Sequence, residues 1–178
     1  MSTQALSHIR RSVFGKPDKY NILLFHTDED YETRLCSTGH EFYTFSAEGE
    51  KKWDKSVRDM PSNYYCLPQN AIYQGLRYDF ILSQSKVWQF NVASRIQERL
   101  NIPIVSLQAS GPDKDLSSQD LEATRQMVGV VNVFSTDHDA ALWGWHTKER
   151  TVILEDKSDE EFVEKWNSIF NSAYEAKQ

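Results

Sequence analysis

The pattern that decides the fold lies at residues 20–45, YNILLFHTDEDYETRLCSTGHEFYTF. An apolar run at 21–25 stops at His26, a polar and acidic segment follows, and a second apolar run occupies 41–45. Continuous apolar runs are typical of strands covered on both faces. The polar segment favours a helix, with Thr27 as its expected N-cap, acids in its first turn and a glycine at its end. The stretch therefore predicts a strand–helix–strand unit.

The same alternation continues along the chain. Five more strand-like runs follow: NYYCL (63–67), DFILS (79–83), PIVSL (103–107), VNVFS (131–135) and TVILE (151–155). Helical periodicity or capping signals lie between or after these runs, at 89–100, from Ser117 or Ser118 to Met127, and after the capping box SDEE at 158–161.

This order of elements predicts one α/β domain. We expect a Rossmann-like, mostly parallel sheet of about six to seven strands with helices on both faces. The domain is expected to span 20–178 and to follow a flexible N-terminal arm at 1–19. The segment 46–62 is expected to be a long loop.

Composition limits the classes of function. The net charge of −6 and pI of about 5.4 argue against a general nucleic-acid binder, whose surface is basic. Neither Cys36 nor Cys66 belongs to a CxxC motif, which argues against a zinc site or a disulfide framework and fits a reducing cytoplasm. The apolar runs are too short to span a membrane, and the N-terminus lacks the apolar region of a secretory signal.

Polar residues follow the predicted strands, and ligands of doubly wound folds bind at the carboxyl ends of strands. His26 suits acceptor binding or a catalytic base, or else a hydrogen bond to nearby backbone, and the two alternatives carry equal weight. The acids Asp28, Glu29, Asp30 and Glu32 could orient sugar hydroxyls or bind a cation. Favourable placement in a first helical turn explains the first three as well.

A second polar group follows the strand at 79–83. Ser83, Gln84 and Gln89 could hold a sugar or an anion, although helix capping explains the serine equally simply. The Asp137-His138-Asp139 string is interpreted as a helix start rather than a metal site. GxGxxG and GxxxxGK[ST] motifs are absent from the sequence, which argues against a dinucleotide or P-loop phosphate site. We predict no cofactor and no metal.

Aromatic residues divide by context. Trp143, Trp145 and Trp166 are expected to anchor the core. Trp53 and Trp88 lie in or beside loops, where stacking on a sugar or base competes with ordinary packing. His40 precedes a strand and is expected to be structural.

Several stretches, taken in order, resemble a known family. They are HTDEDYETRLCSTGHEFY, Trp53, MPSNYYCLP, YDFILSQSKVWQFNVASRIQERLNIPIVSLQASGP and VNVFSTDHDAALWG. Together they look like the N-terminal half of a GT-B glycosyltransferase, of the family-4-like kind found in bacteria and phages. The resemblance covers roughly residues 20–145 and is most specific at 31–43.

The resemblance implies an acceptor-binding role. In that family, an N-terminal Rossmann-like domain holds the acceptor and a C-terminal one holds the nucleotide sugar. The chain stops at residue 178, so we expect the donor-binding half to be missing. The family pattern Ser-Leu-Glu-His is replaced here by Ser106-Leu107-Gln108-Ala109, and Gln108 cannot act as a general base.

The candidate site combines the polar residues that follow the predicted strands with the residues that carry the family resemblance. His26 is the candidate catalytic residue, and the expected ligand-binding residues are Thr27, Tyr31, Glu32, Thr33, Ser83, Gln84, Gln89 and Gln108. On this hypothesis, replacing His26 or Glu32 by alanine weakens binding and leaves the melting temperature nearly unchanged.

The hypothesis of choice is a glycosyltransferase-like acceptor-side domain that acts with a separate donor-binding chain or is inactive alone. The alternative is a non-enzymatic and phage-encoded binding protein that binds a host protein or a small nucleotide. Transfer by a homodimer ranks last. The expected location is the cytoplasm, which is the host cytoplasm for a phage protein.

Overall fold

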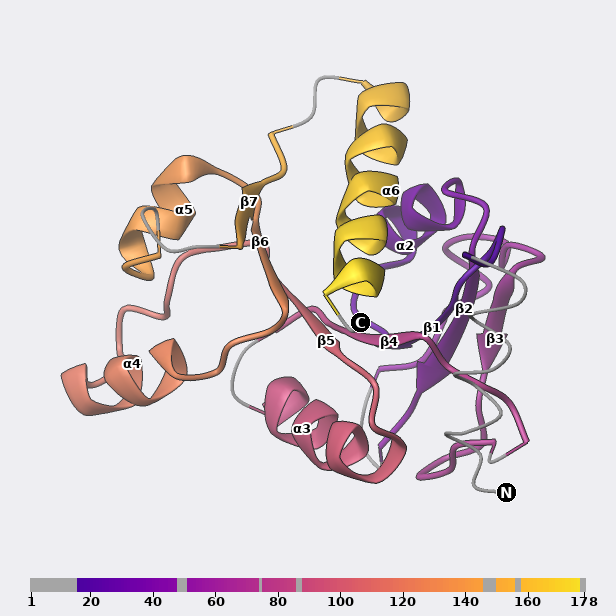
Figure 1. Ribbon diagram of the computed structural model, residues 1–178, viewed down its shortest axis with the longest axis horizontal. Helices are drawn as coiled ribbons and strands as arrows, with labels where there is room; N and C mark the ends of the chain where they lie inside the picture. Colours follow the sequence, from indigo (N-terminus) through magenta and orange to yellow (C-terminus); the bar gives the residue numbers. More distant parts are fainter. Residues whose placement is uncertain are drawn as a thin grey trace.

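A seven-stranded parallel sheet is the centre of the fold. The computed structural model describes residues 16–47, 51–73, 75–85, 88–145, 150–155 and 158–176. Within this part, the strand order is β3-β2-β1-β4-β5-β6-β7 (Figure 1). The strands are β1 (Asn21–Phe25), β2 (Glu41–Phe45), β3 (Tyr64–Cys66), β4 (Phe80–Ser83), β5 (Ile104–Gln108), β6 (Val131–Phe134) and β7 (Thr151–Ile153). The predicted Rossmann-like α/β class is therefore confirmed.

Five helices accompany the sheet in the described part of the chain. They are α2 (Glu29–Cys36), α3 (Trp88–Leu100), α4 (Ser118–Arg125), α5 (Asp137–Leu142) and α6 (Asp159–Glu175). Helices α2 and α6 lie against one face of the sheet, and α3 lies against the other (Figure 1). None of these helices is both long and apolar enough to cross a membrane. Most of the predicted N-terminal arm, residues 1–15, falls outside the described residues.

The start of α2 differs from the sequence prediction. Asp28, not Thr27, is the N-cap, because its side chain accepts a hydrogen bond from the Tyr31 amide at 2.8 Å. Thr27 instead directs its own amide and hydroxyl to Glu32. The helix ends before Gly39, whose φ of +81° is a backbone conformation that glycine adopts without strain.

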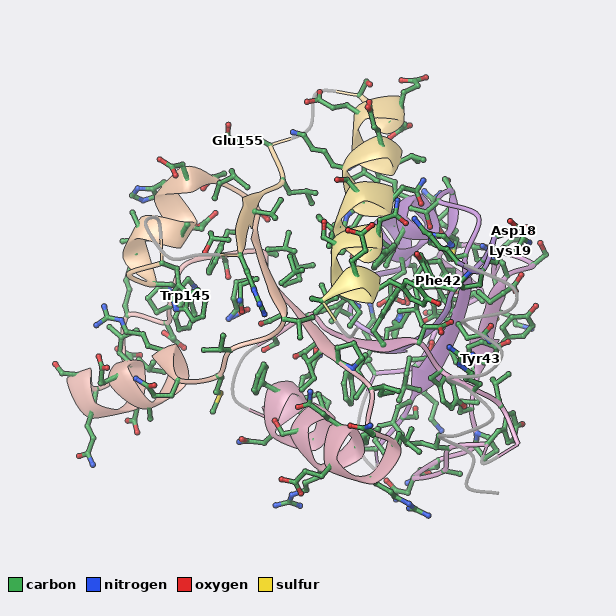
Figure 2. All side chains as sticks on the ribbon, in the orientation of Figure 1. Asp18, Lys19, Phe42, Tyr43, Trp145 and Glu155 are labelled. Carbon is green, nitrogen blue, oxygen red and sulfur yellow. The ribbon has the colours of Figure 1, made fainter. Side chains whose placement is uncertain are left out.

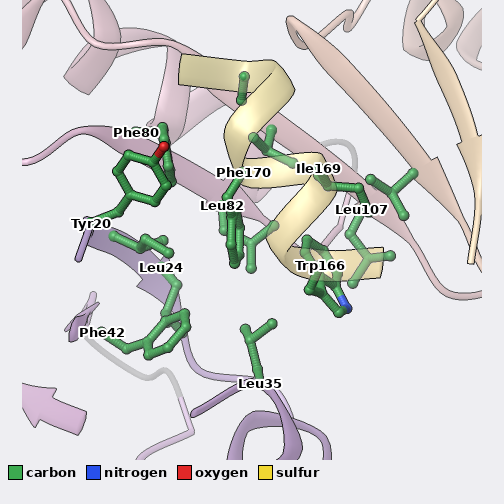
Figure 3. Packing of buried hydrophobic residues seen from close by; sticks show 14 of the residues in the cluster. Tyr20, Leu24, Leu35, Phe42, Phe80, Leu82, Leu107, Trp166, Ile169 and Phe170 are labelled. Atoms are coloured by element: carbon green, nitrogen blue, oxygen red, sulfur yellow. The ribbon is translucent and has the colours of Figure 1, made fainter. Parts of the chain in front are cut away.

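The largest core cluster joins α6 to the sheet. Trp166 and Phe170 are fully buried, and Phe170 stacks on Phe80 of β4 with ring centroids 5.5 Å apart. Figure 3 shows the α6 side chains facing Leu82 and Leu107 from the strands. Burial of this apolar stripe explains why the predicted helical period after residue 158 forms a docked helix.

A smaller cluster lies beside β6 and β7. Trp143 and Trp145 are buried there with Phe134. Figure 2 shows Trp145 on the side of the sheet where α4 and α5 lie. All three tryptophans that were expected to anchor the core, these two and Trp166, are thus buried.

Between β1 and β4, the connecting helices change from one face of the sheet to the other. After β1 the chain turns through α2 to β2, whereas after the adjacent β4 it turns through α3 to β5, on the opposite face. Adjacent parallel strands that send their helices to opposite faces form a topological switch point, where such folds bind ligands. We call the side of the sheet at which the strands end the carboxyl edge.

Candidate functional site

A buried polar cluster lies at the carboxyl edge, next to the switch point. His26 directly follows β1 and is only 7% exposed. Its Nδ1 lies 2.7 Å from Glu32 Oε2, and its Nε2 lies 3.2 Å from Glu29 Oε1. The two glutamates are three residues apart on α2, a spacing that places both on the same face of a helix. One imidazole therefore bridges two carboxylates.

Glu32 is the centre of this cluster and has no exposed surface. Its Oε1 accepts from the Thr27 amide at 2.7 Å and from Gln84 Nε2 at 3.0 Å. Its Oε2 accepts from the Tyr64 hydroxyl at 2.5 Å in addition to its contact with His26. These donors satisfy a buried carboxylate that would otherwise be strongly destabilising.

Glu29 connects the cluster to the loop after β2. Its Oε2 accepts from Lys51 Nζ at 2.8 Å, and its Oε1 accepts from the Asp54 amide at 3.1 Å. Between these two residues, Trp53 is buried against His26 and Tyr64, with ring centroids 5.7 and 4.6 Å apart. The predicted loop is thus attached to the site through α2.

Burial and pairing shift the pKa values of three groups in the cluster: those of His26 and Tyr64 are raised, and that of Glu29 is lowered. Burial alone would lower the pKa of His26, but the hydrogen bonds and charges of Glu32 and Glu29 outweigh it, so the pKa is raised. The Lys51 ammonium is the main reason that the pKa of Glu29 is lowered to about 2. Burial, followed by the charge of Glu32, raises the pKa of Tyr64, which keeps the phenol protonated.

Two glutamines link the cluster to β4 and α3. Gln84 follows β4, and its Nε2 donates to the Phe25 carbonyl at 2.8 Å as well as to Glu32. The backbone amide of Gln84 donates to Gln89 Oε1 at 2.9 Å. These contacts tie the ends of β1 and β4 together across the switch point. Ser83 makes a local contact instead, donating to the Ser85 carbonyl at 2.8 Å.

The structure brings only part of the predicted set together. His26, Thr27, Glu32, Gln84 and Gln89 form one connected network, as described above. The ligand-binding role of every residue in the predicted set stays a prediction.

Three more predicted residues lie on α2 and at the end of β5. Tyr31 packs edge-on against Phe162 of α6, with centroids 5.6 Å apart, and Thr33 donates to the Glu29 carbonyl of its own helix at 2.7 Å. The first contact packs α2 against α6, and the second stays within α2. Gln108 is the last residue of β5 and is buried.

The residues that sequence reasoning missed are Tyr64 and Lys51, together with the buried role of Glu29. The spacing of Glu29 and Glu32 on one helix was the available signal, but first-turn acids are common enough to hide it. Tyr64 and Lys51 reach the cluster only because β3 and the loop before it fold back beside β2. Nothing local in the sequence indicates that return.

Two other motifs have structural roles. His40 is buried, its Nδ1 accepts from the Tyr20 amide at 3.3 Å, and burial lowers its pKa to about 4. In the DxD string, Asp139 is the third residue of α5, and its amide is capped by Thr136. In the described part of the chain, no group of three or more His, Cys, Asp or Glu side chains is placed to hold a metal ion.

Comparison with known proteins gives no relative. No family model, no curated protein and no solved structure matches this chain. The fold and the contacts at the carboxyl edge are therefore the basis for assigning a function.

Proposed function

We propose that this chain is a glycosyltransferase-like acceptor-side domain, which binds a neutral, hydroxyl-rich acceptor at the carboxyl edge and relies on a separate donor-binding unit for transfer. The family resemblance of the sequence, the Rossmann-like sheet and the switch point between β1 and β4 support this proposal. A sugar is the class of acceptor that the surface of this edge suits best.

The exposed ring of Trp88 carries the proposal. Trp88 is the first residue of α3 and remains 37% exposed. Its ring packs edge-on against Phe25 at the end of β1, with centroids 5.7 Å apart and planes at 81°. The ring is thus fixed by the core on one side and open to solvent on the other. A fixed and partly exposed aromatic ring is suited to stack on the apolar face of a sugar.

The side chains that follow the strands have complementary chemistry. Thr27, Ser85, Ser110 and Ser135 follow β1, β4, β5 and β6, respectively, and each is exposed or partly exposed. All four carry hydroxyls, which can accept hydrogen bonds without adding charge, although the Thr27 hydroxyl already donates its proton to Glu32. A neutral polyol fits such an edge better than a phosphate or a basic group.

The buried cluster favours binding over catalysis by this chain alone. Both ring nitrogens of His26 face carboxylates, so the candidate base is engaged by the protein itself. Gln108 occupies a position where the resembling family has an ionisable residue, and an amide cannot act as a base. Transfer would then require groups from the donor-binding unit.

The same observation favours a second candidate function, a non-enzymatic binding protein. Such a protein would use the carboxyl edge to hold a small nucleotide or a host protein, with no reaction to perform. Cys36 and Cys66 are free thiols, which is consistent with a cytoplasmic location for either function.

Ligand-observed NMR against a panel of oligosaccharides and nucleotides tests the choice between the two. We expect an oligosaccharide to bind, and Trp88→Ala to weaken its binding by about tenfold through loss of ring stacking. Tyr65→Ala is the matched control. Tyr65 is 41% exposed, but its hydroxyl donates to Glu41 at the start of β2, away from the carboxyl edge. Equal binding by the Trp88 variant and the wild type would refute the proposed surface.

Native mass spectrometry of the tagged protein from its own cells tests the separate donor unit. A complex with a chain that carries a nucleotide-sugar domain supports the transferase proposal. A complex with an unrelated protein, or binding of nucleotides in place of sugars, supports the second candidate.

A further inference from the structure

The segment at 51–58, which we call the strap, is held over the buried cluster by few contacts. Two of them are to Glu29, from Lys51 Nζ and from the Asp54 amide. A third is the packing of Trp53 on His26 and Tyr64. All strap residues except Trp53 are exposed. The attachment of the strap therefore depends on the state of the cluster.

Both ring nitrogens of His26 must donate for the observed arrangement to hold. Nδ1 faces an oxygen of Glu32 and Nε2 faces an oxygen of Glu29. A neutral imidazole has one N–H donor, whereas an imidazolium has two. With a neutral ring, one lone pair would point at a buried carboxylate oxygen. The geometry is therefore that of a protonated histidine between two carboxylates.

The distances identify which contact is lost first. The Nδ1 contact with Glu32 is 2.7 Å long, and the Nε2 contact with Glu29 is 3.2 Å long. The shorter bond holds its proton more strongly, so deprotonation leaves the Nδ1–H tautomer. The Nε2 lone pair then faces Glu29, the residue to which the strap is attached.

The geometry points to a proton-controlled strap: protonated His26 holds residues 51–58 closed over the carboxyl edge, and loss of the Nε2 proton releases them. Release uncovers His26 and Tyr64, which Trp53 covers in the closed state. The residues that become accessible adjoin Thr27 at the switch point. The strap thereby regulates access to this edge.

Each element packed around the His26 ring supplies charged, titratable or polar groups that affect its protonation. Helix α2 supplies Glu29 and Glu32, β3 supplies Tyr64, and the strap supplies Lys51 and Asp54. The strap is also joined to α2 by an ion pair between Arg58 and Asp30, which is exposed and therefore weak. From β4 the neutral Gln84 side chain meets Glu32, and Cys36 and Cys66 lie within electrostatic reach of Glu32.

The direction of the pH effect follows from the shifted pKa. The pKa of His26 is raised from 6.5, so the contribution of the imidazolium is complete below that pH and is lost as the pH rises through the raised value. Lys51 stays charged throughout, because its own pKa is raised by Glu29. The ammonium therefore does not release the strap over the same range.

Hydrogen exchange at the Asp54 amide measures the strap directly, since that amide donates to Glu29. The protection factor, corrected for the intrinsic pH dependence of exchange, is expected to fall by about tenfold or more as His26 loses its proton. In parallel, NMR of the His26 ring reports its protonation in the same samples. Amides of β5 report whether the sheet stays folded.

His26→Gln should give low Asp54 protection at every pH, and Lys51→Met should weaken protection without removing its pH dependence. His138→Gln is the control, because His138 is exposed on α5 and should leave the profile unchanged. Asp54 protection that stays constant while the wild-type His26 ring titrates overturns the proposal, and this measurement does not depend on whether the variants fold.

The regulatory meaning of the strap rests on the proposed binding function. The exchange experiment uses no ligand, so its failure is distinct from a failure to bind sugars.

Discussion

Replacing Glu32 by glutamine is the sharpest test of the buried cluster. Each Glu32 oxygen accepts at least two donors: Oε1 meets Thr27 and Gln84, and Oε2 meets His26 and Tyr64. A glutamine fits the same space, but its amide nitrogen would face a pair of donors in either orientation.

The expected loss follows from the hydrogen bonds removed. Two charge-assisted hydrogen bonds of about 1.5–3 kcal/mol each are lost, and the Tyr64 hydroxyl can turn to accept one from the new amide, which offsets part of the loss. We therefore expect Glu32→Gln to lower the free energy of unfolding by about 3 kcal/mol. The complete burial of Glu32 reverses the expectation, drawn from the sequence, that its replacement leaves stability nearly unchanged.

Urea denaturation at pH 7, followed by far-UV circular dichroism, measures this difference. The matched control is Glu98→Gln, which makes the same change at an exposed position of α3 and should stay within about 0.5 kcal/mol of wild type. A loss below about 1 kcal/mol for Glu32→Gln, with an unchanged denaturant dependence, would refute the inference that this carboxylate organises the cluster.

Two further predictions concern the core. Trp166→Ala should reduce the free energy of unfolding by about 3–5 kcal/mol, because the ring is fully buried between α6 and the sheet. A loss below about 1 kcal/mol in urea titrations would mean that α6 is not docked as described. His40, whose pKa is lowered to about 4 by burial, should make the protein less stable as the pH falls from 6.5 toward 4, since the unfolded chain takes up that proton first. The urea midpoint of His40→Gln should therefore fall less than that of wild type between pH 7 and pH 5, and equal falls would contradict a buried neutral imidazole.

The strands were predictable because their apolar runs are continuous. The predicted ranges 21–25 and 41–45 coincide with β1 and β2, and β5 is displaced by one residue, which makes Gln108 its last member. Both faces of such a sheet are covered, so burial leaves a period-free apolar signal in each strand. The cap of α2 was less predictable, since Thr27 and Asp28 are both good N-caps. The Thr27 amide and hydroxyl are directed to Glu32, and Asp28 takes the cap position.

The candidate site was predictable only where neighbours in sequence are also neighbours in space. His26, Thr27 and Glu32 belong to one strand–helix unit, and their grouping was expected from the rule that ligands bind at carboxyl ends. The contact of Gln84 with Glu32 joins residues 52 positions apart, and that of Tyr64 joins residues 32 positions apart. Those contacts depend on strand order, which no local pattern specifies.

The sequence by itself determined the class of fold, the approximate positions of its elements and the polar character of the carboxyl edge, because these follow from short-range periodicity and turn chemistry. Only the tertiary structure decided that the acids of α2 face inward, that His26 bridges two of them, and that the strap closes over the bridge. The physical reason is burial. First-turn acids are common at exposed positions, so their presence in the sequence does not indicate burial. The packing of β3 and the strap buries Glu29 and Glu32, and the donors around them satisfy carboxylates that burial alone would destabilise.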